Sequence, residues 1–228
     1  MGNFDKIMRE NLGDLSKQLL ESFIPIEVEK IIPVPPKIRK TIIEREADNL
    51  FLIKTVGAGD FILHLEFQST NDTDMALRTA VYNYMAQYTY NIEVMSVVVY
   101  IGRERMNMKN TLSSNGNLFT FKLVDIREMD PVLFLKSHNP KELILAVLAG
   151  DDEKNRKLII KKIIDKLHRL TISGSRLTEL LVQLEIISLL RGKKIQQFVI
   201  KQKENMPIII DIREDLRYQQ GLKEGTSE

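Results

Sequence analysis

One predicted strand carries two side chains that could do chemistry together. In the stretch FILHLEFQST, apolar residues alternate with others, so a β-strand would point Glu66 and Gln68 in the same direction. Asp48 begins the preceding predicted strand, and we expect a hairpin that places it a few residues beyond Glu66, near Thr70. Asp48 and Glu66 could then hold a hard divalent cation such as Mg²⁺ or Mn²⁺, with positions left open for water.

A cation held in this way could activate a water molecule and neutralise charge on a phosphate group. Gln68, on the side of Glu66, could orient that water or contact a phosphate oxygen. The alternative is structural: Asp48 would cap or solvate a strand end, while Glu66 and Gln68 would face solvent.

Several other kinds of site are excluded or disfavoured. The chain contains no Cys, which excludes disulfides and thiolate metal sites. Its three histidines lie in unrelated segments, so a three-histidine zinc centre is not expected. No glycine-rich nucleotide-binding motif, zinc-protease motif or nucleophile-elbow motif is present. We therefore expect no small organic cofactor.

The elements around these residues predict an α/β fold with a central mixed sheet. Two strands, roughly 47–56 and 61–69, are joined by GAGD, which is typical of a tight turn. A helix follows the capping cluster at 71–73, and VMSVVVYIG is typical of a strand covered on both faces. Strand, helix and strand in this order predict a right-handed crossover to a parallel neighbour.

The remaining segments predict helices at both ends of this core. Residues 4–22 have the spacing of one amphipathic helix, the proline-broken segment after them indicates extended chain at a sheet edge, and NLFTFKLVDI indicates one strand. Three helical patterns follow residue 139. We divide the chain into a core at 1–137, a helical basic region at 138–205 and a polar tail at 206–228.

The helical region is strongly basic, whereas the rest of the chain is acidic overall. Between Lys154 and Lys203 the only acidic residues are Asp165, Glu179 and Glu185. A basic face of this kind is compatible with a polyanion such as DNA, or it is a solvated helix surface. One predicted helix would bury Leu158 and its apolar neighbours on one side. The other sides of this helix carry the candidate DNA-binding residues, Lys157, Lys161, Lys162 and Lys166.

The composition is that of a folded protein rather than a disordered one. The chain of 228 residues is 43% hydrophobic and 28% charged. Its first twenty residues are charged and amphipathic, unlike a signal peptide, and no apolar run approaches the roughly 20 residues that span a bilayer. We expect a cytoplasmic protein without membrane segments.

Together these residues resemble a known family. Asp48, then Glu66-Phe67-Gln68, then Arg78 and Tyr82 on the following helix are similar to the Rpn family of recombination-promoting nucleases and transposases. That family belongs to the PD-(D/E)XK nuclease superfamily. The matching stretches are EREADNLFLIKTV, FILHLEFQSTNDTDMALRTAVYNYM and VMSVVVYIG.

The resemblance implies a restriction-endonuclease-like core at 1–137 and metal-dependent cleavage of DNA. It implies that Asp48 and Glu66 bind the metal and that Gln68 stands where the superfamily has a lysine. A carboxamide cannot supply the charge of an ammonium group, which leaves open whether hydrolysis is slow, uses a second metal or has been lost. The alternative function is therefore a DNA-binding or protein-interaction module. Cleavage of both strands is simplest in a two-fold homodimer.

Four further residues are accessory candidates: Glu10, His64, Arg78 and Tyr82. Superfamily members often contribute an extra acidic residue from the first helix, which would be Glu10, although an exposed helix carboxylate is the favoured interpretation of this residue. Arg78 and Tyr82 share a helix face; Arg78 could brace Glu66, meet a phosphate, or pair with Asp74. His64 points the same way as Glu66 and is either a buried structural histidine or a group that positions water.

Overall fold

The computed structural model describes residues 4, 7–8, 11, 16–24, 26–34, 37–40, 43–46, 49–57, 59–114, 116–170 and 173–204. Chain contacts divide it into two compact units. The first extends to Asp130 and includes Ala149–Asp151, and the second consists of Pro131–Leu148 and the residues from Asp152 onward. The candidates Glu10 and Asp48, and the predicted tail at 206–228, lie outside the described residues.

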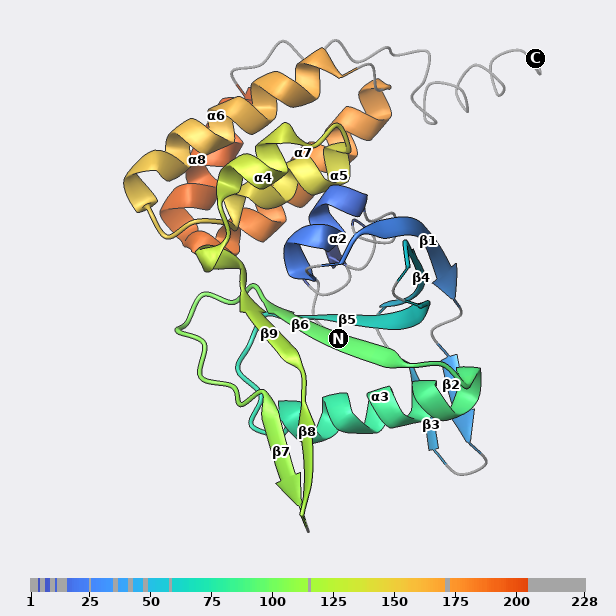
Figure 1. Ribbon diagram of the computed structural model, residues 1–228. Coiled ribbons are helices and arrows are strands. Elements are labelled where there is room, and N and C mark those ends of the chain that lie inside the picture. The colour runs from blue at the N-terminus through green and yellow to red at the C-terminus, as the bar shows by residue number, and fades with distance from the viewer. Residues whose placement is uncertain are drawn as a thin grey trace, which may run out of the picture. The chain divides into compact units, whose positions relative to one another are not determined.

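The first unit is built on a five-stranded mixed sheet, so the predicted mixed α/β class is confirmed (Figure 1). The strand order is β1-β4-β5-β6-β9. Neighbours are antiparallel from β1 to β5 and parallel from β5 to β9. The strands have these bounds: β1 Val28–Val34, β4 Asn49–Thr55, β5 Phe61–Gln68, β6 Val94–Tyr100 and β9 Lys122–Asp125.

The predicted hairpin of β4 and β5 is confirmed, but its predicted register is wrong. Asn49 lies opposite Leu65, whereas pairing of Asp48 near Thr70 would set Asn49 near Ser69. The turn is therefore centred closer to β4 than expected, and it contains Gly57 and Gly59, which both adopt positive φ angles that suit glycine.

The crossover from β5 to a parallel neighbour is also confirmed. Helix α3, Met75–Tyr90, follows β5 and leads into β6, which pairs in parallel with β5. Helix α3 covers one face of the sheet, and α2, Lys17–Phe23, lies on the other (Figure 1). Both faces of β5 are therefore covered, and all its residues except Gln68 are buried.

The expected single strand NLFTFKLVDI is two strands in two different sheets. Strand β8, Asn117–Thr120, forms a hairpin with β7, Thr111–Ser114, and β9 joins the central sheet. The break falls at Phe121, which is buried against α3 residues Met75 and Ala76. Alternation alone predicted one strand because Phe121 continues the apolar pattern of its neighbours.

The N-terminal helix was predicted as one piece, but the described residues show a break. Phe4, Ile7, Met8 and Asn11 are helical. Ser16 then adopts an extended conformation, and its hydroxyl accepts a hydrogen bond from the Leu19 amide at 3.1 Å, so α2 begins anew after it. The predicted edge character is confirmed, because β1 carries Pro33 at the rim of the sheet. A separate hairpin joins β2, Lys37–Lys40, and β3, Ile43–Glu46.

The second unit is helical, and its described residues form five helices where three helical patterns were predicted. The last predicted helix ends before Gly192, because the φ of 106° at this residue does not suit a continuous helix of L-residues, and a further helix begins after it. Its helices, with intervening 3₁₀ turns, are α4 Pro131–Lys136, α5 Pro140–Leu143, α6 Glu153–Arg169, α7 Gly174–Ser188 and α8 Lys193–Glu204.

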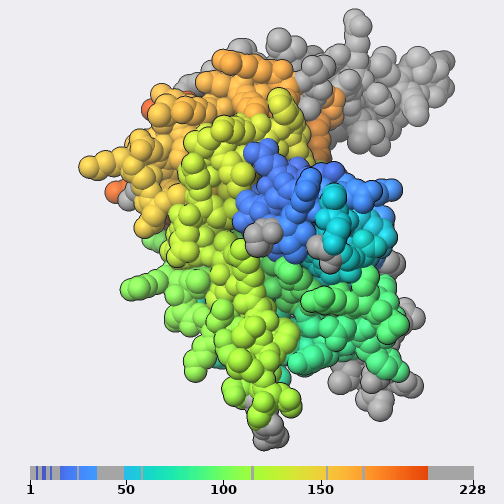
Figure 2. Space-filling model, in the orientation of Figure 1, coloured from blue at the N-terminus to red at the C-terminus, as the bar shows by residue number. Residues whose placement is uncertain are grey.

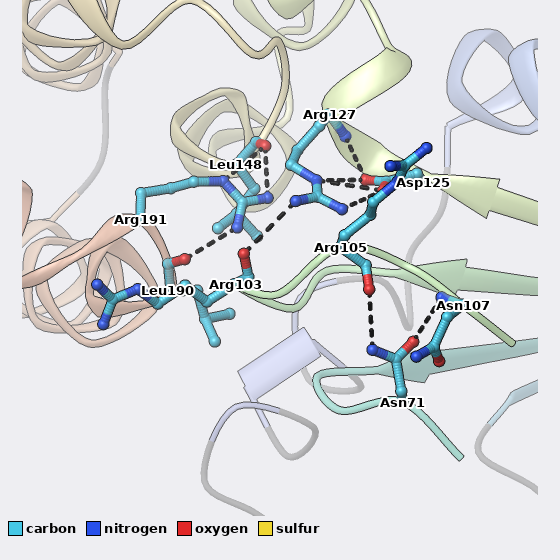
Figure 3. Close-up of polar contacts among 9 residues, drawn as sticks. All are labelled: Asn71, Arg103, Arg105, Asn107, Asp125, Arg127, Leu148, Leu190 and Arg191. Atoms are coloured by element: carbon cyan, nitrogen blue, oxygen red, sulfur yellow. Dashed lines mark hydrogen bonds and ion pairs between the residues drawn. The ribbon is translucent and has the colours of Figure 1, made fainter. Parts of the chain in front are cut away.

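The centre of the second unit is an apolar segment whose carbonyl groups are bound by arginines. The segment Ile144–Leu148 is buried almost completely. Arg156 donates to the Val147 oxygen at 2.6 Å, and Arg191 donates to the Leu148 oxygen through two nitrogens (Figure 3). These bonds satisfy carbonyl oxygens that would be costly to bury unpaired.

Candidate functional site

Glu66 is a buried carboxylate at the centre of the sheet. Its side chain points from β5 toward α3, and only 5% of the residue is exposed. Oxygen Oε1 accepts hydrogen bonds from Arg78 Nη2 and from Gln68 Nε2, the latter at 2.7 Å. Oxygen Oε2 is buried without a hydrogen-bond partner. The carboxylate therefore has one oxygen held by two hydrogen-bond donors and one buried oxygen with none.

Arg78 connects Glu66 to the start of α3. Its second terminal nitrogen, Nη1, donates to Asp72 Oδ2 at 2.7 Å, so one guanidinium bridges two carboxylates. The partner of Arg78 near the helix start is thus Asp72 rather than Asp74, which is the N-cap residue of α3. Asp72 also accepts the Asp74 amide, which holds the first turn in place.

Behind Glu66 lies a second, more deeply buried polar group centred on His64. His64 Nε2 is 3.8 Å from Glu66 Oε2, and His64 Nδ1 is 3.2 Å from the Ser96 hydroxyl. Asn83 of α3 donates to that hydroxyl at 3.0 Å. The ring of Tyr82 lies 5.6 Å from the His64 ring. The structure thus brings both accessory candidates, His64 and Tyr82, to the side of β5 that carries Glu66.

Burial and charge act on Glu66 in opposite directions. Removal from water raises the pKa of Glu66 above its ordinary value, and the nearby Arg78 charge offsets part of that rise. The Glu66 carboxylate is thus paired with Arg78 through Oε1, while Oε2 lies 3.8 Å from His64 Nε2.

The C-terminal ends of the three parallel strands form a row beside this carboxylate. Gln68, Tyr100 and Asp125 lie opposite one another on β5, β6 and β9. The backbone is tight here, because a Cβ on Gly102 would come within 2.5 Å of the Ser69 oxygen. In open α/β sheets, ligands bind in the crevice outside this edge.

Two polar groups at this edge were missed by the sequence analysis (Figure 3). Arg127 binds the Asp125 carboxylate through Nε, at 2.9 Å, and through Nη2. Asn71 holds the loop after β6, because it donates to the Arg105 oxygen at 3.0 Å and accepts from the Asn107 amide at 2.9 Å. A signal was available in the sequence: each group directly follows a predicted strand, where parallel strands place ligand contacts.

The four candidate lysines of α6 differ in their surroundings. Lys157, Lys161 and Lys162 are exposed, and the Lys157 ammonium lies 5.5 Å from the centre of the Phe198 ring. Lys166 instead donates to the Leu135 oxygen at 2.7 Å, which is a structural contact. Leu158 was expected on the buried side of this helix, and that prediction is wrong because Leu158 is exposed.

One oxygen of Glu66 has the chemistry of a ligand for a hard divalent cation. A buried, unpartnered carboxylate oxygen is the kind of ligand that Mg²⁺ or Mn²⁺ takes. Among the residues that the structure describes, no group of three His, Cys, Asp or Glu gathers as a metal site. Asp48, the second expected ligand, lies outside the described residues and directly precedes Asn49, which pairs with Leu65.

Comparisons with protein families, with curated proteins and with solved structures find no match to this chain. Within the described residues, no helix has the length and apolar character needed to cross a membrane.

Proposed function

We propose that the chain is a metal-dependent endonuclease that hydrolyses phosphodiester bonds in DNA. The observation that carries this proposal is the Glu66 carboxylate, whose Oε1 is bound by Arg78 and Gln68 and whose Oε2 is buried without a hydrogen-bond partner. An anionic oxygen in such a place is costly unless a cation meets it. The resemblance to the Rpn family, on Asp48, Glu66 and Gln68, supports the same assignment.

Glu66 Oε2 and Asp48 would hold the cation. When bound, Mg²⁺ or Mn²⁺ supplies an activated water and neutralises charge on the scissile phosphate. Arg78 keeps the Glu66 carboxylate in one orientation, because it is itself fixed by Asp72. Gln68 holds the same oxygen from the neighbouring position of β5, where the superfamily has a lysine.

Each unit by itself carries exposed cations that could contact the phosphate backbone. Arg103 and Arg105 are exposed in the loop that Asn71 holds at the C-terminal edge of the sheet. In the second unit, Lys157, Lys161 and Lys162 are exposed on α6. Phosphate contacts of this kind give affinity without sequence preference and weaken as salt rises.

The ion pair between Arg78 and Glu66 favours a second candidate function, a non-catalytic binding module. Arg78 and Gln68 both occupy Oε1, so the carboxylate already has internal partners that replace part of a cation's role. In this second case the chain binds DNA or another protein and does not hydrolyse it. The two candidates share the fold and differ in whether a divalent ion binds at Glu66.

The test is incubation of supercoiled plasmid with the protein and Mg²⁺ or Mn²⁺. We expect the wild type to nick or linearise the plasmid, and Glu66→Gln and Asp48→Asn each to lower the rate by at least about 100-fold, as expected when a metal ligand is removed. Glu93→Gln, which changes an exposed carboxylate, is the matched control and should keep wild-type activity.

Metal binding is measured separately by thermal unfolding. A cation that binds the folded state raises its stability in proportion to the logarithm of ion concentration above the dissociation constant. We expect Mg²⁺ or Mn²⁺ to raise the midpoint of the wild type and of Glu93→Gln but not of Glu66→Gln. If the wild type shows neither this shift nor cleavage while it retains DNA in a gel, the non-catalytic module is the correct function.

A further inference from the structure

A row of three buried polar side chains leads from α3 to Glu66, and the proposed cleavage has not yet assigned it a role. His64 on β5 lies directly opposite Ser96 on β6, and His64 Nδ1 is 3.2 Å from the Ser96 hydroxyl. Asn83 Nδ2, on α3, is 3.0 Å from the same hydroxyl and 2.7 Å from the Val94 oxygen. The hydrogen bonds thus run in one order, from α3 through β6 to β5.

These side chains are enclosed by the fold. His64 is fully buried, and Ser96 and Asn83 are 4% and 5% exposed. Helix α3, which covers this face of the sheet, has the β7–β8 hairpin as its neighbour on the visible face in Figure 2. Because buried polar groups satisfy one another rather than exchange partners with bulk water, the position of each hydrogen can be worked out from the contacts.

The contacts of Asn83 identify the nitrogen of its amide. A backbone carbonyl oxygen only accepts hydrogen bonds, so the atom 2.7 Å from the Val94 oxygen is the nitrogen Nδ2. That nitrogen carries two hydrogens, and the second is directed at the Ser96 hydroxyl oxygen. Asn83 therefore donates to Ser96 and offers no acceptor for the hydroxyl hydrogen.

The Ser96 hydroxyl hydrogen is left for His64. Among the described residues, the hydrogen bonds of this hydroxyl are those with Asn83 Nδ2 and His64 Nδ1. The hydroxyl therefore donates to Nδ1, which is the ring nitrogen without a hydrogen. A neutral imidazole then carries its one hydrogen on Nε2, the nitrogen that lies 3.8 Å from Glu66 Oε2.

We infer that Asn83 and Ser96 fix His64 as the tautomer with hydrogen on Nε2, and that this N–H positions the Glu66 carboxylate for a divalent cation. The distance of 3.8 Å exceeds a hydrogen bond, so the N–H acts on Oε2 as an oriented dipole. A carboxylate oxygen has two lone pairs, so one can face the imidazole while the other meets the cation.

This positioning role rests on the proposed metal-dependent function, whereas the tautomer does not. Side chains that orient a metal ligand without touching the metal typically change its affinity by about 10–100-fold when they are removed. His64, Ser96 and Asn83 are positioning residues in this sense, because each acts on the cation only through Glu66.

The tautomer is tested by nitrogen-15 NMR of the full chain labelled at histidine. The chain has three histidines, and His138 and His168 are exposed, so they serve as references in the same spectrum. The His64 signals are those that disappear in His64→Gln. We expect hydrogen on Nε2 and none on Nδ1 near neutral pH. A hydrogen on Nδ1, alone or together with one on Nε2, overturns the inference.

The role of Asn83 is tested by reversing what its side chain offers to Ser96. In Asn83→Asp a carboxylate, which only accepts hydrogen bonds, replaces the amide. The Ser96 hydroxyl can then donate to that carboxylate, so we expect the imidazole hydrogen to move to Nδ1 and to be donated to Ser96. A folded Asn83→Asp protein that keeps hydrogen on Nε2 contradicts the assignment. If this variant does not fold, the wild-type spectrum decides.

The positioning role is tested through Mn²⁺ binding, measured as the rise of the unfolding midpoint with ion concentration. We expect Ser96→Ala to raise the dissociation constant of Mn²⁺ by about 10–100-fold. Ser96→Thr keeps the hydroxyl and should restore most of the affinity. Ser188→Ala is the matched control, because it removes another buried serine hydroxyl, from the second unit, and should leave the His64 signals and the dissociation constant unchanged.

The outcomes separate this inference from the proposed function. If Mn²⁺ binds the wild type and Ser96→Ala equally well, the positioning role is wrong while the metal site remains. If Ser96→Thr is folded by circular dichroism but binds as weakly as Ser96→Ala, disturbed packing of β6 explains the loss and the positioning role is again wrong. If the wild type binds no ion, the proposed function fails and the positioning role fails with it, while the NMR spectrum still decides the tautomer.

Discussion

At the scale of single residues, Gln68 is one of the two side chains that hydrogen-bond to the Glu66 carboxylate. Its amide nitrogen donates to Glu66 Oε1 at 2.7 Å, beside the donor from Arg78. An ammonium group at this position could make the same contact and would add a positive charge next to the proposed scissile phosphate. The amide can offer only hydrogen bonds. Gln68 is also the one half-buried residue of β5, so a longer side chain has a route to solvent.

We predict that Gln68→Lys keeps or raises the rate of plasmid cleavage and changes its dependence on metal concentration. Gln68→Met, of similar length but without a hydrogen-bond donor, is the control and should lower the rate. Cleavage is measured at several Mg²⁺ concentrations with saturating DNA. A Gln68→Lys protein that does not fold would show that Gln68 is a structural amide with no room for an ammonium group.

At the scale of elements, Asn71 joins three parts of the candidate site. It lies between the end of β5 and the start of α3, and it binds the loop that follows β6 through two hydrogen bonds. Asp72, its neighbour, holds Arg78 and through it Glu66. The loop with Arg103 and Arg105 is therefore tied to the segment that orients the carboxylate.

We predict that Asn71→Ala releases this loop. Removal of both bonds should lower the free energy of unfolding by about 1–2 kcal/mol, since a hydrogen bond contributes roughly 0.5–1.5 kcal/mol. Trypsin should then cleave faster after Arg103 and Arg105, because opening of this loop becomes easier. Urea unfolding and mass spectrometry of limited digests measure the two effects.

The variant Asn71→Asp tests the two hydrogen bonds of this side chain individually. It retains the acceptor for the Asn107 amide and removes the donor to the Arg105 oxygen, so its digestion rate should fall between those of the wild type and Asn71→Ala. Equal rates for all three proteins would mean that other contacts hold the loop.

At the scale of the whole molecule, the candidate metal ligand and the candidate DNA-binding lysines lie in different units. The candidate carboxylate lies in the first unit, and the exposed lysines of α6 lie in the second. Lys166 differs from the other three candidates, because its ammonium group donates a hydrogen bond to the Leu135 oxygen. A test of DNA binding should therefore leave Lys166 in place, so that stability and binding are not confounded.

We predict that the triple change of Lys157, Lys161 and Lys162 to Gln weakens binding to all DNA sequences alike. The slope of log affinity against log salt should become shallower by roughly 0.9 for each duplex phosphate that these lysines no longer neutralise. Fluorescence anisotropy with labelled duplexes at several salt concentrations measures both quantities. Cleavage at saturating DNA should persist, because these lysines lie outside β4 and β5.

The matched control removes three exposed lysines from α8 of the same unit, Lys193, Lys194 and Lys201, again to Gln. If only the control set lowers the slope, DNA engages α8 rather than α6. If neither set does, the basic helices are a solvated surface and DNA binds elsewhere.

The sequence by itself determined which side chains share a direction. Alternation in β5 placed His64, Glu66 and Gln68 on one side, and helical spacing placed Arg78 and Tyr82 on one face of α3. The structure brings these two sets together, as the Arg78–Glu66 ion pair and the His64–Tyr82 ring contact show. Such periodicities are local properties of the chain and need no tertiary information.

Only the tertiary structure decided which groups are partners and which are buried. The register of β4 on β5, the choice of Asp72 for Arg78 and the capture of Lys166 by the Leu135 oxygen each depend on how segments are placed in space, which the local residue pattern does not specify. The alternating pattern of β5 would be the same whether Glu66 faced solvent or was buried. Glu66 is buried because α3 covers the face of the sheet to which it points. Periodicity specifies a direction, whereas burial and pairing depend on what the rest of the fold places in that direction.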